Sequence, residues 1–208
     1  MGIFAVDGKL AVFLNRLGSL IVLNLLTVVC CIPVITAGAA MTALYSMTLR
    51  LTRGEEEQVV GNYLKAFRDN FKQATLLWLI GGGILLFMAF DIWLLRSLTG
   101  TFGQVYRIIL FVLLLFFVMV LIHAFAVLAR FDNTTRNTVK NALLFCAGHI
   151  GPACLMVAVA LIPVILLTVS YRFLSVGILI GISGPAYLES MYFTPLFRTY
   201  EGDAADEK

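Results

Sequence analysis

The most constraining feature of this sequence is a stretch of thirty-three residues, 17–49, that contains no Asp, Glu, Lys, Arg or His. An uncharged stretch of this length is typical of a membrane segment. As one straight helix it would be about 50 Å long, whereas the hydrocarbon core of a bilayer is only about 30 Å thick. Pro33 lies at its middle, and proline removes a backbone donor and disfavours helix in the preceding residue. We therefore predict a helix break at Pro33, so that the stretch either crosses the membrane twice or re-enters it.

The composition extends this interpretation to the whole chain. Hydrophobic residues make up 61% of the sequence and charged residues 13%, whereas soluble domains contain about 25% charged residues. Four further long apolar runs follow the first stretch. We predict a single membrane domain over 1–208, all-α and polytopic, with about six transmembrane segments, or with five and a re-entrant hairpin as the alternative. Too few residues remain for a soluble catalytic domain, and nucleic acid is not an expected partner.

The expected domain has four parts. Residues 17–49 form the hairpin broken at Pro33, and 50–73 form a cytoplasmic loop that carries an amphipathic helix. Residues 74–197 form a bundle of four spans, and the acidic residues 198–208 form a disordered tail.

The four spans of the bundle are placed by its apolar runs, at 74–95, 108–129, 141–169 and 174–193. Pro152 and Pro163 lie inside the third span and are expected to kink it. Gly177 and Gly181 give the last span a GxxxG face, which allows another helix to approach closely. That helix belongs either to the same chain or to a second copy in a homo-oligomer.

Within the loop 50–73, apolar residues recur with a helical period from Val59 onward. Lys65, Arg68 and Lys72 fall on a neighbouring arc of the same helix. Basic residues beside an apolar face suit anionic lipid headgroups. This helix is therefore predicted to lie on the bilayer, where its basic arc contacts either lipid or a protein partner.

The basic residues also predict the orientation of the chain. With six crossings and both termini in the cytoplasm, twelve Lys and Arg residues lie inside, and only Arg96, Arg107 and Arg172 lie outside. Five crossings with the N-terminus outside would place ten of the Lys and Arg residues inside and five outside. Because cytoplasmic loops are enriched in Lys and Arg, we predict a cytoplasmic-membrane protein with both termini inside.

Five polar residues within the apolar runs form the candidate site. At 1.5 Å per residue, Asn24, His123, His149 and Glu189 all lie about 10–13 Å from the cytoplasmic surface in the six-crossing arrangement, and Tyr45 lies near this level. Polar residues at membrane depth are costly and indicate function unless they serve helix packing. These five residues either share one site, which binds a hydroxyl-rich solute or carries protons, or form separate hydrogen bonds between helices.

No pattern in the sequence indicates catalysis. An HExxH zinc motif, a nucleotide-binding P-loop and paired carboxylates are absent. Gly181-Ile182-Ser183-Gly184 matches the GxSG of rhomboid intramembrane proteases. In rhomboids the catalytic histidine lies on a later helix, whereas both histidines of this chain precede Ser183. We predict a protein that is not an enzyme and that holds no metal or cofactor.

Two motifs together suggest a family. Residues 31–40 read Cys-Ile-Pro-Val-Ile-Thr-Ala-Gly-Ala-Ala, followed by Ala-Leu-Tyr at 43–45 and Arg-Gly-Glu-Glu at 53–56. Residues 67–75 read Phe-Arg-Asp-Asn-Phe-Lys-Gln-Ala-Thr. This combination resembles the YesL family of bacterial integral membrane proteins, most closely over residues 15–80.

The YesL resemblance implies a bacterial membrane location and an association with carbohydrate uptake, but no established activity. On this basis the chain is expected to be an accessory or regulatory component of uptake, with an ABC sugar permease or its ATPase as a possible partner. The alternative is a small autonomous solute transporter that uses the five polar residues.

Overall fold

The computed structural model of the chain describes residues 9–55, 58–97, 100–131, 133–169, 177 and 179–206. Every regular element in these residues is helical, which confirms the predicted all-α class. The elements are α1 (Lys9–Cys31), η1 (Val34–Thr36), α2 (Ala37–Thr52), α3 (Val59–Leu94), η2 (Leu95–Ser97), α4 (Thr101–Arg130), α5 (Thr135–Gly148), α6 (Ile150–Val169) and α8 (Ser183–Asp206).

Within these residues, four helical segments are long and apolar enough to cross a membrane. They are Leu10–Cys31, Val34–Thr52, Val59–Leu94 and Thr101–Arg130. A fifth candidate is the pair Thr135–Gly148 and Ile150–Leu166, which is bent by 105°. The chain is thus a polytopic helical membrane protein. The first part of the last predicted span, 174–193, lies outside the described residues, and α8 begins only at Ser183.

The predicted break at Pro33 is present. Helix α1 ends at Cys31, and the short helix η1 follows Pro33 before α2 begins. The Thr36 hydroxyl donates to the Cys30 carbonyl oxygen at 2.6 Å. This bond satisfies one of the carbonyl groups that the end of a helix leaves without a backbone donor.

Helix α3 differs from the prediction because it joins two expected elements. The amphipathic helix of the loop 50–73 and the span 74–95 form one uninterrupted helix, Val59–Leu94. Its buried residues Tyr63, Ala74, Leu77 and Gly81 continue along one side across the expected boundary. No proline interrupts the 36 residues, which measure about 54 Å at 1.5 Å per residue.

In the third predicted span, 141–169, the kink expected near Pro152 is a full break of 105°. The helix breaks at His149, which separates α5 from α6. Pro152 explains the break, because it has no N–H to donate to the Gly148 carbonyl and its ring crowds that carbonyl. In the first turn of α6 the same proline is tolerated. Pro163 remains inside α6.

Residues 198–206, predicted as part of a disordered tail, are helical. Helix α8 continues to Asp206. Phe197 is buried just before the expected tail, and its ring packs edge-on against Phe131 and Phe145, with centroids 5.2 and 5.7 Å away. This contact anchors the last part of α8 to α4 and α5, so the helix is held in place where we expected it to end.

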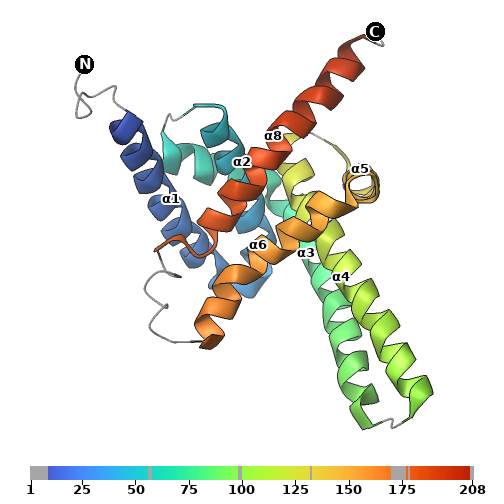
Figure 1. Ribbon diagram of the computed structural model, residues 1–208. Coiled ribbons are helices and arrows are strands. Elements are labelled where there is room, and N and C mark those ends of the chain that lie inside the picture. The colour runs from blue at the N-terminus through green and yellow to red at the C-terminus, as the bar shows by residue number, and fades with distance from the viewer. Residues whose placement is uncertain are drawn as a thin grey trace.

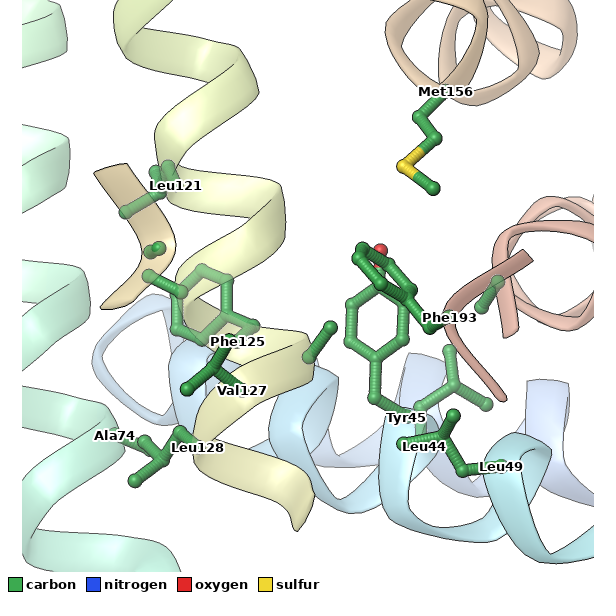
Figure 2. Packing of buried hydrophobic residues seen from close by; sticks show 14 of the residues in the cluster. Leu44, Tyr45, Leu49, Ala74, Leu121, Phe125, Val127, Leu128, Met156 and Phe193 are labelled. Atoms are coloured by element: carbon green, nitrogen blue, oxygen red, sulfur yellow. The ribbon is translucent and has the colours of Figure 1, made fainter. Parts of the chain in front are cut away.

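The core surrounds α2, which packs against α1, α3, α4 and α8 (Figure 1). Small residues such as Ala39 and Ala43 are completely buried, so the neighbouring helices approach α2 closely. Figure 2 shows the Tyr45 ring of α2 beside the Phe193 ring of α8, with Phe125 of α4 facing the same core. The core is therefore built from helices at both ends of the chain.

The Pro33 turn lies beside the middle of α3. The Trp78 indole N–H donates to the Val34 carbonyl oxygen at 2.8 Å. From Trp78, α3 runs sixteen residues to Leu94, or about 24 Å. In Figure 1 the lower halves of α3 and α4 extend together beyond the rest of the molecule, and their surface is apolar, with Phe87 70% and Phe102 83% exposed. If the apolar ends of α3 and α4 occupy the bilayer, the Pro33 turn lies within the bilayer and does not reach the membrane surface near Leu94. The geometry favours a re-entrant hairpin over a second crossing.

We predict that a cysteine that replaces Val34 is not labelled by a membrane-impermeant maleimide, when the reagent is added on the side of the membrane from which a cysteine that replaces Thr101 is labelled. The comparison uses Val34→Cys and Thr101→Cys in a background in which Cys30, Cys31, Cys146 and Cys154 are replaced by Ala. Val34 is 70% exposed on the protein surface, so its protection would come from lipid. Equal labelling of the two positions would contradict re-entrance.

We also predict that Gly38→Ala lowers the thermal stability of the detergent-purified protein, measured by tryptophan fluorescence. A Cβ atom at Gly38 would collide with the Ala74 carbonyl oxygen and lie 2.5 Å from the Trp78 Cβ. Because backbone must move, the expected loss is about 1–3 kcal/mol. Gly18→Ala is the control, since a Cβ there meets nothing within 4 Å. Equal stability of the two variants would contradict the close packing of α2 on α3.

Candidate functional site

Helices α2 and α8 are joined by a seam of three polar pairs. The Tyr45 hydroxyl donates to Glu189 Oε2. The Thr48 and Ser190 hydroxyl oxygens lie 2.7 Å apart, and those of Thr52 and Thr194 lie 2.6 Å apart. Residue numbers rise together on both helices, so α2 and α8 run parallel.

The Tyr45–Glu189 pair contains the acid of this seam, and both of its side chains are buried. Tyr45 is 2% exposed and Glu189 is 3% exposed. A carboxyl group at membrane depth is expensive to place and needs partners. Among the described residues no Lys or Arg forms an ion pair with Glu189. The Tyr45 hydroxyl is therefore the donor that holds Glu189 in place.

Both histidines lie near this pair and are connected to it through aromatic rings. The His123 Nδ1 lies 2.9 Å from the Met119 carbonyl oxygen, to which it donates, and its ring meets Phe193 edge-on at 5.1 Å. Phe193 also contacts the Tyr45 ring edge-on at 6.4 Å. The His149 ring lies 6.4 Å from the ring of Tyr192, the residue before Phe193.

Each histidine keeps one buried nitrogen that makes no hydrogen bond within the described part of the chain. These atoms are Nε2 of His123 and Nδ1 of His149. Buried polar atoms in native proteins are normally bonded to protein or water. Two such nitrogens lie around one turn of α8, close to the Tyr45–Glu189 pair.

Asn24 makes hydrogen bonds between helices, which is the second of the two roles that the sequence left open. Its side-chain Oδ1 accepts hydrogen bonds from the backbone N–H groups of Ile182 and Ser183, each at 2.8 Å. These N–H groups belong to the start of α8, whose first donors have no partner within the helix. Asn24 thus caps α8 from α1, and its Nδ2 also donates to the Gly177 carbonyl at 3.4 Å.

The structure therefore brings four of the five predicted residues, Tyr45, His123, His149 and Glu189, to one region and places Asn24 at the start of α8. Sequence reasoning missed the hydroxyl pairs of the seam. The spacing of Tyr45, Thr48 and Thr52 places them on one side of a helix and could have indicated a polar seam, but their partners on α8 could not be chosen from sequence.

The basic arc of Lys65, Arg68 and Lys72 is exposed on α3, as its position in the helix predicts. The apolar face predicted beside the basic arc has a buried part and a half-exposed part. Tyr63 is fully buried, whereas Val60, Leu64 and Phe71 remain between 37% and 45% exposed. The exposed apolar residues lie between the buried face and the basic arc on the helical wheel.

Gly177 and Gly181 lie one helical turn apart and contact each other. The Gly181 N–H donates to the Gly177 carbonyl at 2.9 Å. A Cβ at Gly181 would lie 2.7 Å from the Gly177 Cα. A homo-oligomer through these glycines stays a prediction. Within the described residues, no group of three or more His, Cys, Asp or Glu side chains is arranged to hold a metal ion.

We predict that Asn24→Ala destabilises the protein by about 1–3 kcal/mol, because it leaves two buried backbone donors of α8 without their acceptor. The measurement is thermal unfolding in detergent. Thr42→Val is the control, since the buried Thr42 hydroxyl donates to the Gly38 carbonyl oxygen of its own helix, α2, at 2.9 Å. If both variants unfold at the same temperature, the cap does not hold α8.

Comparison with known proteins found one family. A family model described as "Protein of unknown function, DUF624" matches residues 20–92, less than half of the chain. DUF624 is the domain of YesL-type proteins, so this match agrees with the resemblance over the region that carries it. No significant match was found among curated proteins or among solved structures. From α1 to the end of α3, which includes Asn24, Tyr45 and the basic arc, the chain is similar to DUF624 proteins.

Proposed function

We propose that this chain is a multi-pass protein of the bacterial cytoplasmic membrane, with both termini in the cytoplasm, that acts as an accessory or regulatory component of carbohydrate uptake. The role in carbohydrate uptake rests on the resemblance to YesL proteins. A role in contacting a partner is supported by one observation. Helix α3 is fixed to the core and exposes the basic arc of Lys65, Arg68 and Lys72. No step of this role requires catalysis.

Two contacts support the arc as a rigid surface. The Tyr63 ring is fully buried, and its hydroxyl donates to the Ala40 carbonyl of α2 at 3.3 Å. Further along α3, the Gln73 side chain donates to the Asn133 carbonyl at 2.8 Å. The side chains between these two points are thus presented on a backbone that neighbouring elements hold.

The composition of the surface suggests its partner. Three cations lie beside the half-exposed Leu64 and Phe71. Interfaces combine apolar contact with complementary charge. An acidic surface of an ABC sugar permease or of its ATPase would match this arrangement. Lipid headgroups offer the same negative charge, and the experiment below separates the two.

The second candidate function is autonomous transport of a solute through the region of the Tyr45–Glu189 pair. The observation in its favour is that both residues line a cavity of about 380 Å³. Ionisable residues at membrane depth often mark transport pathways. The double variant Glu189→Gln with His149→Ala tests this function without touching the basic arc.

We predict that a tagged chain, purified from native membranes in mild detergent, recovers an ABC permease or ATPase, identified by mass spectrometry. Reversal of Lys65, Arg68 and Lys72 to Glu should reduce this recovery about tenfold or more, since a like charge replaces each attraction. The control reverses Arg136, Lys140 and Arg198, three exposed cations elsewhere on the molecule.

Each outcome of this experiment distinguishes the candidates. Loss of the partner only in the first variant supports the contact surface. Equal recovery in all variants contradicts it. If the first variant instead loses anionic phospholipid that co-purifies with the unmodified protein and with the control, the arc binds lipid headgroups. If the Glu189→Gln and His149→Ala double variant abolishes uptake by the cell but keeps the partner, the transport function is supported.

A further inference from the structure

The cavity beside the Tyr45–Glu189 pair has an almost entirely apolar lining. It measures about 380 Å³ and lies among α1, α2, α4, α6 and the start of α8. Its apolar lining includes Val28, Met41, Ile122, Pro163, Ile182 and Ala186. This volume lies within the range of small-molecule sites, about 300–1,000 Å³.

Glu189 and Tyr45 supply the polar side chains of this cavity. The Tyr45 hydroxyl reaches one carboxylate oxygen, Oε2. A carboxylate has two oxygens and about four positions at which a donor can bind. No Lys or Arg of the described residues pairs with it. Among the described residues that line the cavity, the buried carboxylate therefore has apolar neighbours and no cation to neutralise it.

This chemistry disfavours a hydroxyl-rich solute, which was one of the alternatives that the sequence left open for these residues. Each hydroxyl of a sugar that is buried without a partner costs about 1–3 kcal/mol. The cavity offers two polar side chains against many apolar ones. A molecule with an apolar body and one donor group fits better, and a primary ammonium group complements the carboxylate in charge as well as in hydrogen bonding.

A second cavity of about 360 Å³ extends the apolar space. It shares Pro163, Gly177, Gly181 and Pro185 with the first, so the two lie next to each other. Its other walls are also apolar, and Ile162 at its edge is 48% exposed. Val164, at the edge of the first cavity, is 54% exposed. Both cavities thus adjoin the apolar outer surface of α6, from which a lipid-soluble molecule would enter.

We infer that these adjoining cavities bind a single-chain amphiphile with a primary amine head, which pairs with Glu189 while its hydrocarbon chain lies against Pro163 and Pro185. The chemical class of the ligand follows from the buried carboxylate and the apolar walls. This site does not depend on the proposed contact surface, which lies on α3.

The test uses the full-length protein in phosphatidylcholine nanodiscs and a hexadecylamine that carries a photoreactive diazirine in its chain. The comparison probe is hexadecanoic acid with the same diazirine, which has the same chain and an anionic head. Cross-linked peptides are identified by mass spectrometry. We expect the amine to label α6 and α8 at the cavity walls about tenfold more than the acid, because Glu189 attracts one head and repels the other.

Two variants decide whether the carboxylate is responsible. Glu189→Gln should reduce labelling by the amine about tenfold, since the amide keeps the shape and can still accept from Tyr45 but removes the charge. Thr52→Val is the matched control on the same seam, and it lies outside both cavities. It should label like the unmodified protein.

Three outcomes would overturn the inference. They are equal labelling by the amine and the acid, undiminished amine labelling in Glu189→Gln, and cross-links spread over the exposed surface of α3 and α4. Each of these results indicates simple partition into the surrounding lipid. Partner recovery is measured on the same samples, so that a Glu189→Gln protein that loses the amine but keeps its partner separates this site from the proposed function.

Discussion

A helix enclosed by other helices at membrane depth must satisfy its polar groups inside the protein, and α2 is such a helix. It packs against α1, α3, α4 and α8, and most of its residues are buried. On one side its small residues permit close contact with α3. On another, the hydroxyl groups of Tyr45, Thr48 and Thr52 contact polar side chains of α8. These two kinds of contact fix the positions of α3 and α8, and thus of both candidate sites.

The two sides of α2 separate two kinds of chemistry. Toward α8 lies a buried carboxyl group with histidines nearby and an apolar cavity beside it. Toward α3 lies a scaffold that carries the exposed cations of the basic arc on its outer surface. A ligand in the cavity would contact α2 directly through Tyr45. The same helix meets Tyr63 through the Ala40 carbonyl, so α2 provides a physical connection between the two regions.

Features determined by local chemistry were predictable from sequence. The apolar runs indicated an all-α membrane protein, and Pro33 indicated the break, because both depend on residues within one or two turns. Depth along each helix also identified four residues that do gather around α8. Features determined by contacts between distant residues were not predictable. The position of the Pro33 turn beside Trp78 depends on how α2 slides along α3, and the capping role of Asn24 depends on a segment more than 150 residues away.

The cap that Asn24 places on α8 has a consequence for the order of assembly. During translation the acceptor is made 158 residues before the first of the two backbone donors. Until α8 emerges, the side chains of α2 that face it have no partners from that helix. The earlier helices therefore remain in the membrane with these polar side chains of α2 not yet covered by α8. Completion of the fold is a late event, and a ribosome that stops before α8 leaves an intermediate whose exposed polar groups distinguish it from the finished protein.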